Sequence, residues 1–127
     1  MFPAMPGPVR LLIVDDDAEV LRSLTWLAQT RGFAVEGCRS AGDAISRSGD
    51  GRRFDCLVID QKLPDLPGIE LLAQLRRRGI YAPAILITTA PSPTLRRLAV
   101  QADIPIVEKP LLNDALFDQI ERAIDPG

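Results

Sequence analysis

Short apolar runs recur along the chain and end in polar residues or turns. The first, Val9 to Val14, contains one polar residue, Arg10, and stops at Asp15-Asp16-Asp17. Because the run is otherwise continuous and rich in Val, Ile and Leu, it predicts a strand buried on both faces of a sheet. Similar runs predict strands at 33–38, 54–59, 84–87 and 104–107.

Segments with helical spacing of apolar residues follow these runs. Asp17 and Ser40 are expected to cap the first two helices, and Gly32 to end the first. Arg76–Arg78 is expected to be the solvated end of the third helix, and Trp26 to lie off the inner stripe of the first. The expected stripes are Val20, Leu21, Leu24, Leu27, Ala28 and Arg31 in the first helix, Ile69, Leu72 and Leu75 in the third, Leu95, Leu98, Ala99 and Ala102 in the fourth, and Leu112, Leu116, Ile120 and Ala123 in the fifth.

The alternation of strands and helices predicts the fold class. Five strands alternating with five helices indicate an α/β fold, a doubly wound parallel sheet with right-handed crossovers and helices on both faces. The 127 residues suffice for one domain, which we place at 9–125. Residues 1–8, with three prolines and a glycine, are expected to be a disordered lead, and no output domain is expected.

Composition and charge exclude several classes of function. Hydrophobic residues make up 46% and charged residues 25% of the chain, as in ordinary globular proteins. The formal net charge of −2 argues against direct nucleic-acid binding through a basic surface. The apolar runs are too short to span a membrane and the N-terminus does not resemble a signal peptide, so we expect a cytoplasmic protein without membrane insertion.

Two residue types narrow the chemistry further. Histidine is absent, which excludes imidazole metal sites, hydrolysis by Ser-His-Asp or Cys-His groups, and a role as phosphohistidine donor. The two cysteines, Cys38 and Cys56, lie in predicted strands. We interpret them as small buried hydrophobic residues and not as a disulfide.

Reactive polar residues stand where the predicted strands end. They are Asp15 to Asp17, Asp60, Thr88 with Thr89, and Lys109. Sites in doubly wound sheets form beyond the carboxyl ends of the strands, so these side chains are expected to converge. Crowded carboxylates repel one another unless a cation is present, and Mg²⁺ suits such oxygen ligands. An aspartate nucleophile, a metal, a lysine and a hydroxyl are the parts needed for phosphoryl transfer, which we expect at Asp60.

Four motifs resemble, in order, those of the receiver domain of two-component response regulators. They are Leu-Leu-Ile-Val-Asp15-Asp16-Asp17, Asp60-Gln-Lys-Leu-Pro64-Asp-Leu-Pro-Gly68, Ala-Ile-Leu-Ile-Thr88 and Glu-Lys109-Pro110. The resemblance covers nearly the whole chain, from about Val9 to the last predicted helix. It implies a flavodoxin-like receiver fold with five parallel strands in the order 2-1-3-4-5.

The resemblance also implies a phosphorylation site and a metal site. Asp60 would accept a phosphoryl group from the phosphohistidine of a histidine kinase or histidine phosphotransfer protein, or from a small donor such as acetyl phosphate. Asp16 and Asp60 would bind Mg²⁺ directly, with the backbone carbonyl of Lys62 as third ligand. Asp15 would assist, directly or through water.

Further roles follow from the same resemblance. Lys109 would pair with Asp60 and then with the phosphoryl group. The Thr88 hydroxyl would move toward a phosphoryl oxygen and bias the face formed by the fourth helix, fifth strand and fifth helix. Asp17 is interpreted as an N-cap and not as a ligand. Such a domain has no metabolic substrate, catalyses only reactions of its own phosphoryl group, and signals through a downstream protein that the sequence does not identify.

The chain departs from the family pattern near the site. Ile106 replaces the aromatic residue often found three positions before the lysine, so an aromatic rotamer switch is impossible. Lys62 places a second amine near Asp60, where the family pattern implies an influence on hydrolysis of the acyl phosphate.

The switch hydroxyl has two candidates. The register set by Pro83 favours Thr88, although Thr89 followed by Ala90 also fits the motif. If Thr88 is the switch residue, Thr89 would either crowd the phosphoryl pocket or add a competing hydroxyl.

The sequence also leaves two other functions open. An adaptor that works without phosphorylation is favoured by these departures, but the intact acids and Lys109 argue against it. A haloacid dehalogenase-like phosphatase would use Asp15 and Asp17, which have the required two-residue spacing. However, Glu19 stands where that family has threonine or valine, and no cap domain is expected.

Overall fold

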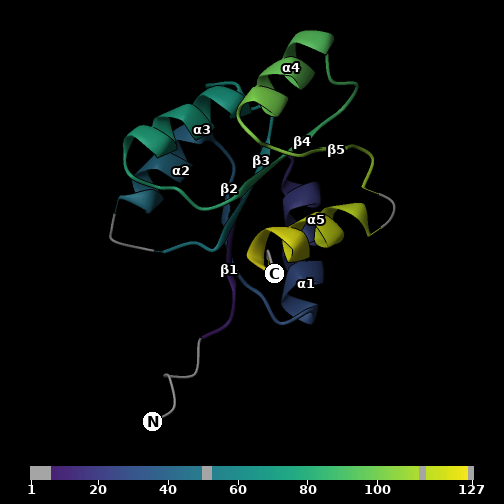
Figure 1. The fold of residues 1–127 in the computed structure, drawn as a ribbon. Coiled ribbons are helices and arrows are strands. Elements are labelled where there is room, and N and C mark those ends of the chain that lie inside the picture. The colour runs from purple at the N-terminus through teal and green to yellow at the C-terminus, as the bar shows by residue number, and fades with distance from the viewer. Residues whose placement is uncertain (1–6, 50–52, 112–113, 126–127) are drawn as a thin grey trace.

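A computed structural model describes residues 7–49, 53–111 and 114–125 of the chain. Strands and helices alternate along it (Figure 1). The strands are β1 (Arg10–Val14), β2 (Ala34–Cys38), β3 (Cys56–Asp60), β4 (Ala84–Thr88) and β5 (Ile106–Glu108). The helices are α1 (Ala18–Thr30), α2 (Ala41–Ser48), α3 (Gly68–Arg77), α4 (Pro93–Gln101) and α5 (Ala115–Ile124). All five predicted strands are present, with ends shifted by at most two residues.

The strands form one sheet in the order β2-β1-β3-β4-β5, and every pairing is parallel. In the register, Leu12 of β1 lies between Glu36 of β2 and Leu57 of β3. The predicted doubly wound fold and strand order are confirmed. Because the chain changes direction across the sheet between β1 and β3, a crevice is expected beyond the carboxyl ends of these two strands.

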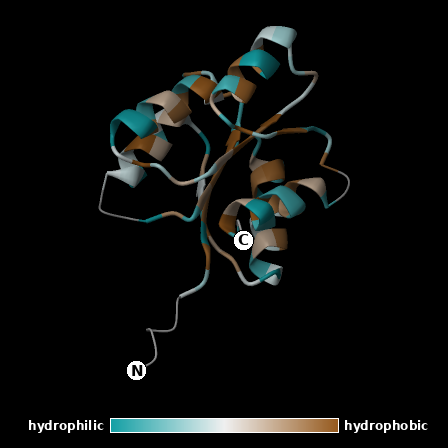
Figure 2. Ribbon diagram, in the orientation of Figure 1, coloured by the Kyte–Doolittle hydropathy of each residue, from teal (hydrophilic) through white to brown (hydrophobic). Residues whose placement is uncertain are grey.

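Alternate residues of the central strands face opposite sides of the sheet. Leu12, Leu57 and Leu86 pack with side chains of α2, α3 and α4, whereas Ile13 and Val58 pack with α1 and α5. Figure 1 shows these two groups of helices on opposite sides of the sheet, and Figure 2 shows the hydrophobic strands between them. Burial on both faces explains why the strand sequences are continuous apolar runs.

Both predicted N-caps are confirmed. The Asp17 side chain accepts hydrogen bonds from the backbone N–H groups of Glu19 and Val20, at 2.9 and 3.2 Å. The Ser40 hydroxyl accepts one from the N–H of Asp43, at 3.1 Å. These bonds satisfy amide groups that have no partner within the helix.

The predicted helix faces are too wide at four positions, one of which is Arg31, the exposed C-cap of α1. Leu27 of α1 is 38% exposed and Leu98 of α4 is 45% exposed, although both were expected to face inward. Ala102, also expected inward, is the exposed C-cap of α4. In a small sheet protein, a short helix has only a narrow contact with the sheet, so residues at the edge of its stripe stay at the surface.

Arg76 corrects the prediction of a fully solvated helix end. Its Nη1 donates hydrogen bonds to the backbone oxygens of Ile80 and Ala82, at 2.9 and 2.7 Å. This side chain therefore ties the last turn of α3 to the connection that enters β4. Arg77 and Arg78 are exposed, as predicted.

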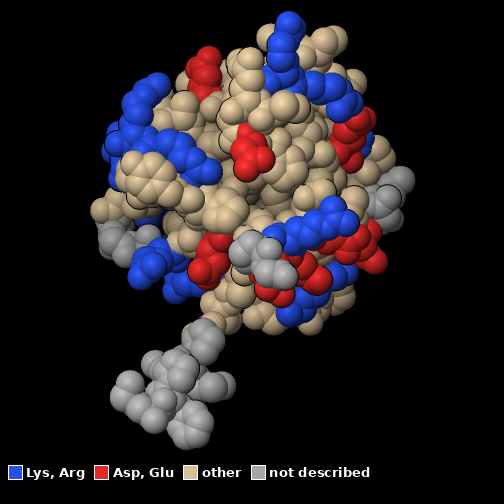
Figure 3. Space-filling view, viewed as in Figure 1, with Lys and Arg blue, Asp and Glu red and all other residues tan. Residues whose placement is uncertain are grey.

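Predictions for several other residues are confirmed or lie outside the described ranges. Trp26 is 64% exposed, and Cys38 and Cys56 are buried free thiols. Leu112 and residues 1–6 are outside the described residues. In the described ranges, no helix has the length and apolar character needed to cross a membrane. Figure 3 shows basic and acidic side chains interspersed on the face of the molecule that it presents.

Candidate functional site

The strand ends bring the predicted polar residues together at one edge of the sheet. Asp15 directly follows β1, Asp60 is the last residue of β3, Thr88 is the last of β4, and Lys109 directly follows β5. Since these four strands are neighbours in the sheet, their carboxyl ends lie side by side. The side chains of Asp15, Asp60 and Lys109 meet at this edge, as expected from the sequence. The Asp17 side chain caps α1 instead, and Thr89 is exposed.

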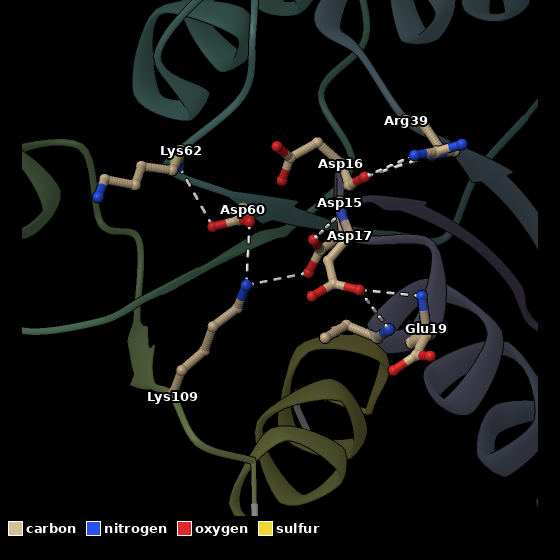
Figure 4. A network of polar contacts seen from close by, with 9 residues as sticks. Asp15, Asp16, Asp17, Glu19, Arg39, Asp60, Lys62 and Lys109 are labelled. Atoms are coloured by element: carbon tan, nitrogen blue, oxygen red, sulfur yellow. Dashed lines mark hydrogen bonds and ion pairs between the residues drawn. The ribbon is translucent and has the colours of Figure 1, made fainter.

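Lys109 lies between two acidic side chains. Its Nζ is 3.0 Å from Asp60 Oδ2 and 3.2 Å from Asp15 Oδ2 (Figure 4). Asp60 Oδ1 also accepts a hydrogen bond from the backbone N–H of Lys62, at 3.2 Å. The peptide bond between Lys109 and Pro110 is cis. The ammonium group thus bridges the ends of β1 and β3 from the far side of β4.

Asp15 is fully buried, at 0% exposure. Its Oδ1 accepts a hydrogen bond from the backbone N–H of Asp17, at 3.0 Å. Its Oδ2 is buried near Lys109 without hydrogen-bond geometry, so among the described residues this oxygen has no hydrogen-bond partner. Asp15 Oδ2 therefore meets Lys109 as an ion pair, and its remaining acceptor capacity can face a bound cation.

Asp16 completes an acidic cluster with Asp15 and Asp60. One carboxylate oxygen from each of the three residues lies within 4.8 Å of the others. Asp16 is exposed, whereas the other two are buried, so the cluster opens to solvent on the Asp16 side. Hard oxygen donors in an open cluster suit Mg²⁺, which keeps several of its waters. The donor set fits this ion, and so does the buried Asp15 Oδ2, which accepts no hydrogen bond from the described residues.

The electrostatics of the buried pair follow from burial and from the neighbouring charges. Burial raises the pKa of Asp60, and the Asp15 charge raises it further, against the lowering effect of Lys109 and of the Lys62 N–H group. Burial lowers the pKa of Lys109, but its contacts with Asp60 and Asp15 outweigh this, so the net direction is up. Lys109 is thus held as an ammonium ion beside the two acidic side chains.

A close approach of backbone to backbone fixes the loop after Asp60. A Cβ on Gly68 would lie 2.3 Å from the Asp60 carbonyl oxygen, so only glycine fits where α3 begins. The Gly68 N–H donates to the Gln61 carbonyl at 2.9 Å, and the Ile69 N–H donates to Gln61 Oε1 at 2.9 Å. Gln61 thereby caps α3, whose N-cap residue Pro67 makes no side-chain cap bond.

Thr88 and Thr89 occupy different environments. Thr88 is 6% exposed, and its backbone oxygen accepts a hydrogen bond from the Lys109 N–H at 2.8 Å. Thr89 is exposed and lines a groove with Lys109 and with residues of α1, among them Val20. Ala90 has a positive φ of 47°, which marks a sharp turn after the two threonines.

The other two predicted modulators lie at the margin of the site. Ile106 is half-buried and packs against the core on the α2, α3 and α4 side of the sheet. Lys62 is exposed, and Figure 4 shows its ammonium group pointing away from Asp60. A second amine beside the acids, as expected from the sequence, is therefore not observed in this conformation.

Two contacts near the acids were missed at the sequence level. Arg39 donates hydrogen bonds from Nε and Nη2 to the backbone oxygen of Asp16, at 3.3 and 3.1 Å. Asp65 accepts hydrogen bonds from the N–H groups of Ala41 and Gly42, at 3.0 and 2.9 Å. An arginine directly after a strand and an aspartate in a turn are both common at surfaces, so neither carries a sequence signal of its own.

Comparisons with known proteins agree with this geometry. A family model described as the response regulator receiver domain matches residues 11–121. The transcriptional regulatory protein FixJ of Rhizobium meliloti is 35% identical over 112 residues, which are 87% of this chain and 54% of that protein. The transcriptional regulatory protein BasR of Escherichia coli is 32% identical over 118 residues, 91% of this chain and 52% of that protein. The chain thus spans about half the length of these curated relatives.

Solved structures extend the similarity to the fold. A CheY-like response regulator receiver domain protein from Methanospirillum hungatei JF-1 has a TM-score of 0.83 at 30% identity, covering 94% of this chain and 95% of that one. The non-phosphorylated HemR receiver domain of Leptospira biflexa, at 22% identity, has a TM-score of 0.84 over 92% of this chain and 94% of that one, and supports the fold alone. The family match, the relatives and the shared fold establish that this chain belongs to the response regulator receiver domains, the signalling domains of two-component systems.

Proposed function

We propose that Asp60 is the phosphoacceptor of this receiver domain and that the reaction takes place in the cytoplasm. The donor is the phosphohistidine of a histidine kinase or histidine phosphotransfer protein, or a small molecule such as acetyl phosphate. A carboxylate oxygen of Asp60 forms a bond to phosphorus while the bond from phosphorus to the donor nitrogen or oxygen breaks. The leaving group keeps the electron pair of that bond. Positioning and charge neutralisation dominate this chemistry, so a preformed site suffices.

The observation that carries the proposal is the placement of Lys109 against Asp60 and Asp15. A carboxylate that attacks an anionic phosphoryl group meets repulsion from the group and from neighbouring acids. Lys109, 3.0 Å from Asp60 Oδ2, offsets part of that repulsion and is positioned to contact a phosphoryl oxygen after transfer. The lysine ammonium group is compact and sits on a flexible side chain. It can therefore move from a carboxylate oxygen to a phosphoryl oxygen within the site.

The same proposal assigns a Mg²⁺ ion to the acidic cluster. Asp16 and Asp60 would hold it, together with the backbone carbonyl of Lys62, and Asp15 would contribute directly or through a water. The spacing of the three carboxylates supports this assignment, as does the buried Asp15 Oδ2, which accepts no hydrogen bond from the described residues. When bound, the ion neutralises negative charge on the carboxylates and on the phosphoryl oxygens.

Thr88 is the proposed switch residue of the site. It is the last residue of β4, and the preceding Ile87 is in register with Asp60 of β3. The Thr88 backbone oxygen accepts a hydrogen bond from the N–H group of Lys109. We assign its hydroxyl to a phosphoryl oxygen, and we assign Thr89, Ala90 and Ile106 to modulation of the pocket and of the response. Ile106 cannot swing as an aromatic side chain would, so the output face is expected either to switch by another movement or to change little.

Output would pass to a protein partner through the surface of α4, β5 and α5. The curated relatives are named as transcriptional regulators, and a role in transcription would belong to the protein in which such a receiver acts. For the receiver itself, with formal net charge −2, we propose no direct nucleic-acid contact. Membership of the receiver family sets the phosphatase alternative aside, and an adaptor without phosphorylation is an outcome of the test below.

Beryllofluoride, which mimics an acyl phosphate, tests the proposal in solution. Backbone amide shifts are followed by NMR during titration with beryllofluoride in the presence of Mg²⁺, for the wild type and for Asp60→Asn. Saturable shifts around Asp60, Thr88 and Lys109 that require Mg²⁺ and are lost in the variant are expected. A wild-type protein without such shifts would leave the adaptor as the better account.

A further inference from the structure

The loop between β2 and α2, together with the first turn of α2, contacts both loops that carry the proposed metal ligands. Arg39 lies between Cys38 of β2 and the N-cap of α2. Its Nε and Nη2 donate hydrogen bonds to the backbone oxygen of Asp16, at 3.3 and 3.1 Å (Figure 4). The N–H of Asp15 donates to the Cys38 carbonyl at 3.0 Å, which continues the pairing of β1 with β2 by one residue. Arg39 extends this attachment one residue further, onto a peptide group outside the sheet.

The first turn of α2, which directly follows this loop, contacts the segment after Asp60. The first N–H groups of α2, from Ala41 and Gly42, donate to the two carboxylate oxygens of Asp65 at 3.0 and 2.9 Å. These hydrogen bonds lower the pKa of Asp65 and keep it ionised, where it also suits the positive end of the helix dipole. Asp65 is three residues beyond Lys62, so this contact limits the movement of the loop that supplies the Lys62 carbonyl.

We propose that residues 39–42 form a brace that positions the metal site. Arg39 is the positioning residue for the Asp16 loop. Asp65, which accepts hydrogen bonds from the brace, is the positioning residue for the loop that contains Lys62. The inference rests on the proposed function, because it concerns the affinity of the proposed Mg²⁺ site. Neither residue touches the ion in this account. Each restricts the backbone of a loop from which a ligand projects, and outer partners of this kind affect metal affinity strongly.

The sign of the effect separates positioning from simple charge. Arg39 is a cation near a cluster that binds a cation, so its removal should strengthen Mg²⁺ binding if charge alone mattered. If Arg39 fixes the Asp16 loop, its removal should weaken Mg²⁺ binding. The loop must then become ordered when the ion binds, and this ordering costs conformational entropy. The two explanations therefore predict opposite directions for one variant.

The test measures the dissociation constant of Mg²⁺ by amide NMR titration, and the stability of the metal-free protein by urea denaturation. Arg39→Ala is expected to raise the dissociation constant by about tenfold, and Arg39→Lys, which can still donate one hydrogen bond, by less. Arg77→Ala removes an exposed arginine at the far end of α3 and serves as the control. The metal-free variants should unfold in the same range of urea as the wild type.

A second pair of variants tests the other arm of the brace. Asp65→Ala is expected to weaken Mg²⁺ binding more than Asp118→Ala, which removes an exposed acid of α5. If the wild type binds Mg²⁺ and folded Arg39→Ala has an unchanged or lower dissociation constant, the brace is overturned. The proposed function is then left intact. A wild type that binds no Mg²⁺ would overturn both.

Discussion

At the scale of single residues, the site depends on one ammonium group that faces two buried carboxylates. The chain has two lysines, Lys62 and Lys109, and they make a matched pair for a test because one points away from the acids and the other lies between them. We expect Lys109→Met to lower the free energy of unfolding by about 2 kcal/mol at pH 7 without metal, since Asp15 and Asp60 lose their partner. Lys62→Met is expected to stay within about 0.5 kcal/mol of the wild type.

Urea denaturation of both variants measures this difference. Addition of Mg²⁺ should recover part of the stability lost in Lys109→Met, because a second cation then meets the acids. Equal stability of the two variants would show that the ion pair contributes nothing to the folded state.

Asp60 is expected to destabilise the metal-free protein at neutral pH. Its pKa is raised in the folded state, chiefly by burial, so the folded state disfavours the ionised form. Ionised Asp60 therefore lowers the free energy of unfolding at any pH above its folded pKa. This destabilisation disappears as the pH falls below 3.8, the pKa in the unfolded state, because the acid is then protonated in both states. Asp60→Asn should therefore raise the free energy of unfolding at pH 7 by on the order of 1 kcal/mol, and by less at pH 5.

Denaturation at the two pH values, without divalent metal, checks the sign. A variant less stable than the wild type at pH 7 would mean that the contact with Lys109 outweighs burial and the Asp15 charge.

Cys38 and Cys56 are expected to resist thiol reagents. Burial raises the pKa of each thiol to about 12, so almost no thiolate is present in the folded state at pH 8. Because unfolded thiols ionise near pH 8.5, the folded state holds these protons more tightly, and stability should fall as the pH rises from about 8.5 toward 12. Ellman's reagent at pH 8 should detect the two thiols only after urea is added, and fast reaction of the native protein would contradict the burial.

At the scale of elements, α3 is pressed against the end of β3. The Cβ of Gly68→Ala would lie 2.3 Å from the Asp60 carbonyl oxygen and 2.9 Å from Ile59 Cγ2, so α3 must retreat from the site. We expect this variant to lose about 2 kcal/mol of stability. Gly49→Ala, whose Cβ would be 3.7 Å from its nearest neighbour, is the control and should change stability little.

Circular dichroism melts of the two glycine variants, together with the beryllofluoride titration of Gly68→Ala, check this expectation. A variant as stable as the wild type and with the same titration would show that α3 can shift without cost to the site.

The strands could be predicted from the sequence better than the helix faces. Burial on both sides makes each strand a continuous apolar run, and the same burial leaves polar residues such as Asp60 and Lys109 at the ends. The inward face of a helix depends on which neighbours cover it, and Leu27 and Leu98 lie at edges that no neighbour covers fully. The contact of Arg39 with Asp16 joins residues 23 positions apart and depends on the path of a loop, which local sequence does not determine.

At the scale of the whole molecule, the sheet is the frame that brings four separate segments to one place. The strand order β2-β1-β3-β4-β5 sets Asp15 and Asp60 on neighbouring strands and Lys109 two strands from Asp60. The two helical layers cover the faces of the sheet and leave its carboxyl edge for the polar residues. A phosphoryl group at this edge would contact the ends of β3, β4 and β5 together. Phosphorylation of one residue could therefore affect the surfaces next to all three strands.

The most direct test of the account is to locate the phosphoryl group. The purified protein is treated with acetyl phosphate and Mg²⁺, the acyl phosphate is reduced with borohydride, and the resulting homoserine is mapped by peptide mass spectrometry. Homoserine is expected at position 60, and it should be absent when Mg²⁺ is chelated. Modification at Asp15 or Asp16 instead, or an unmodified chain under conditions that phosphorylate a known receiver domain, would contradict it.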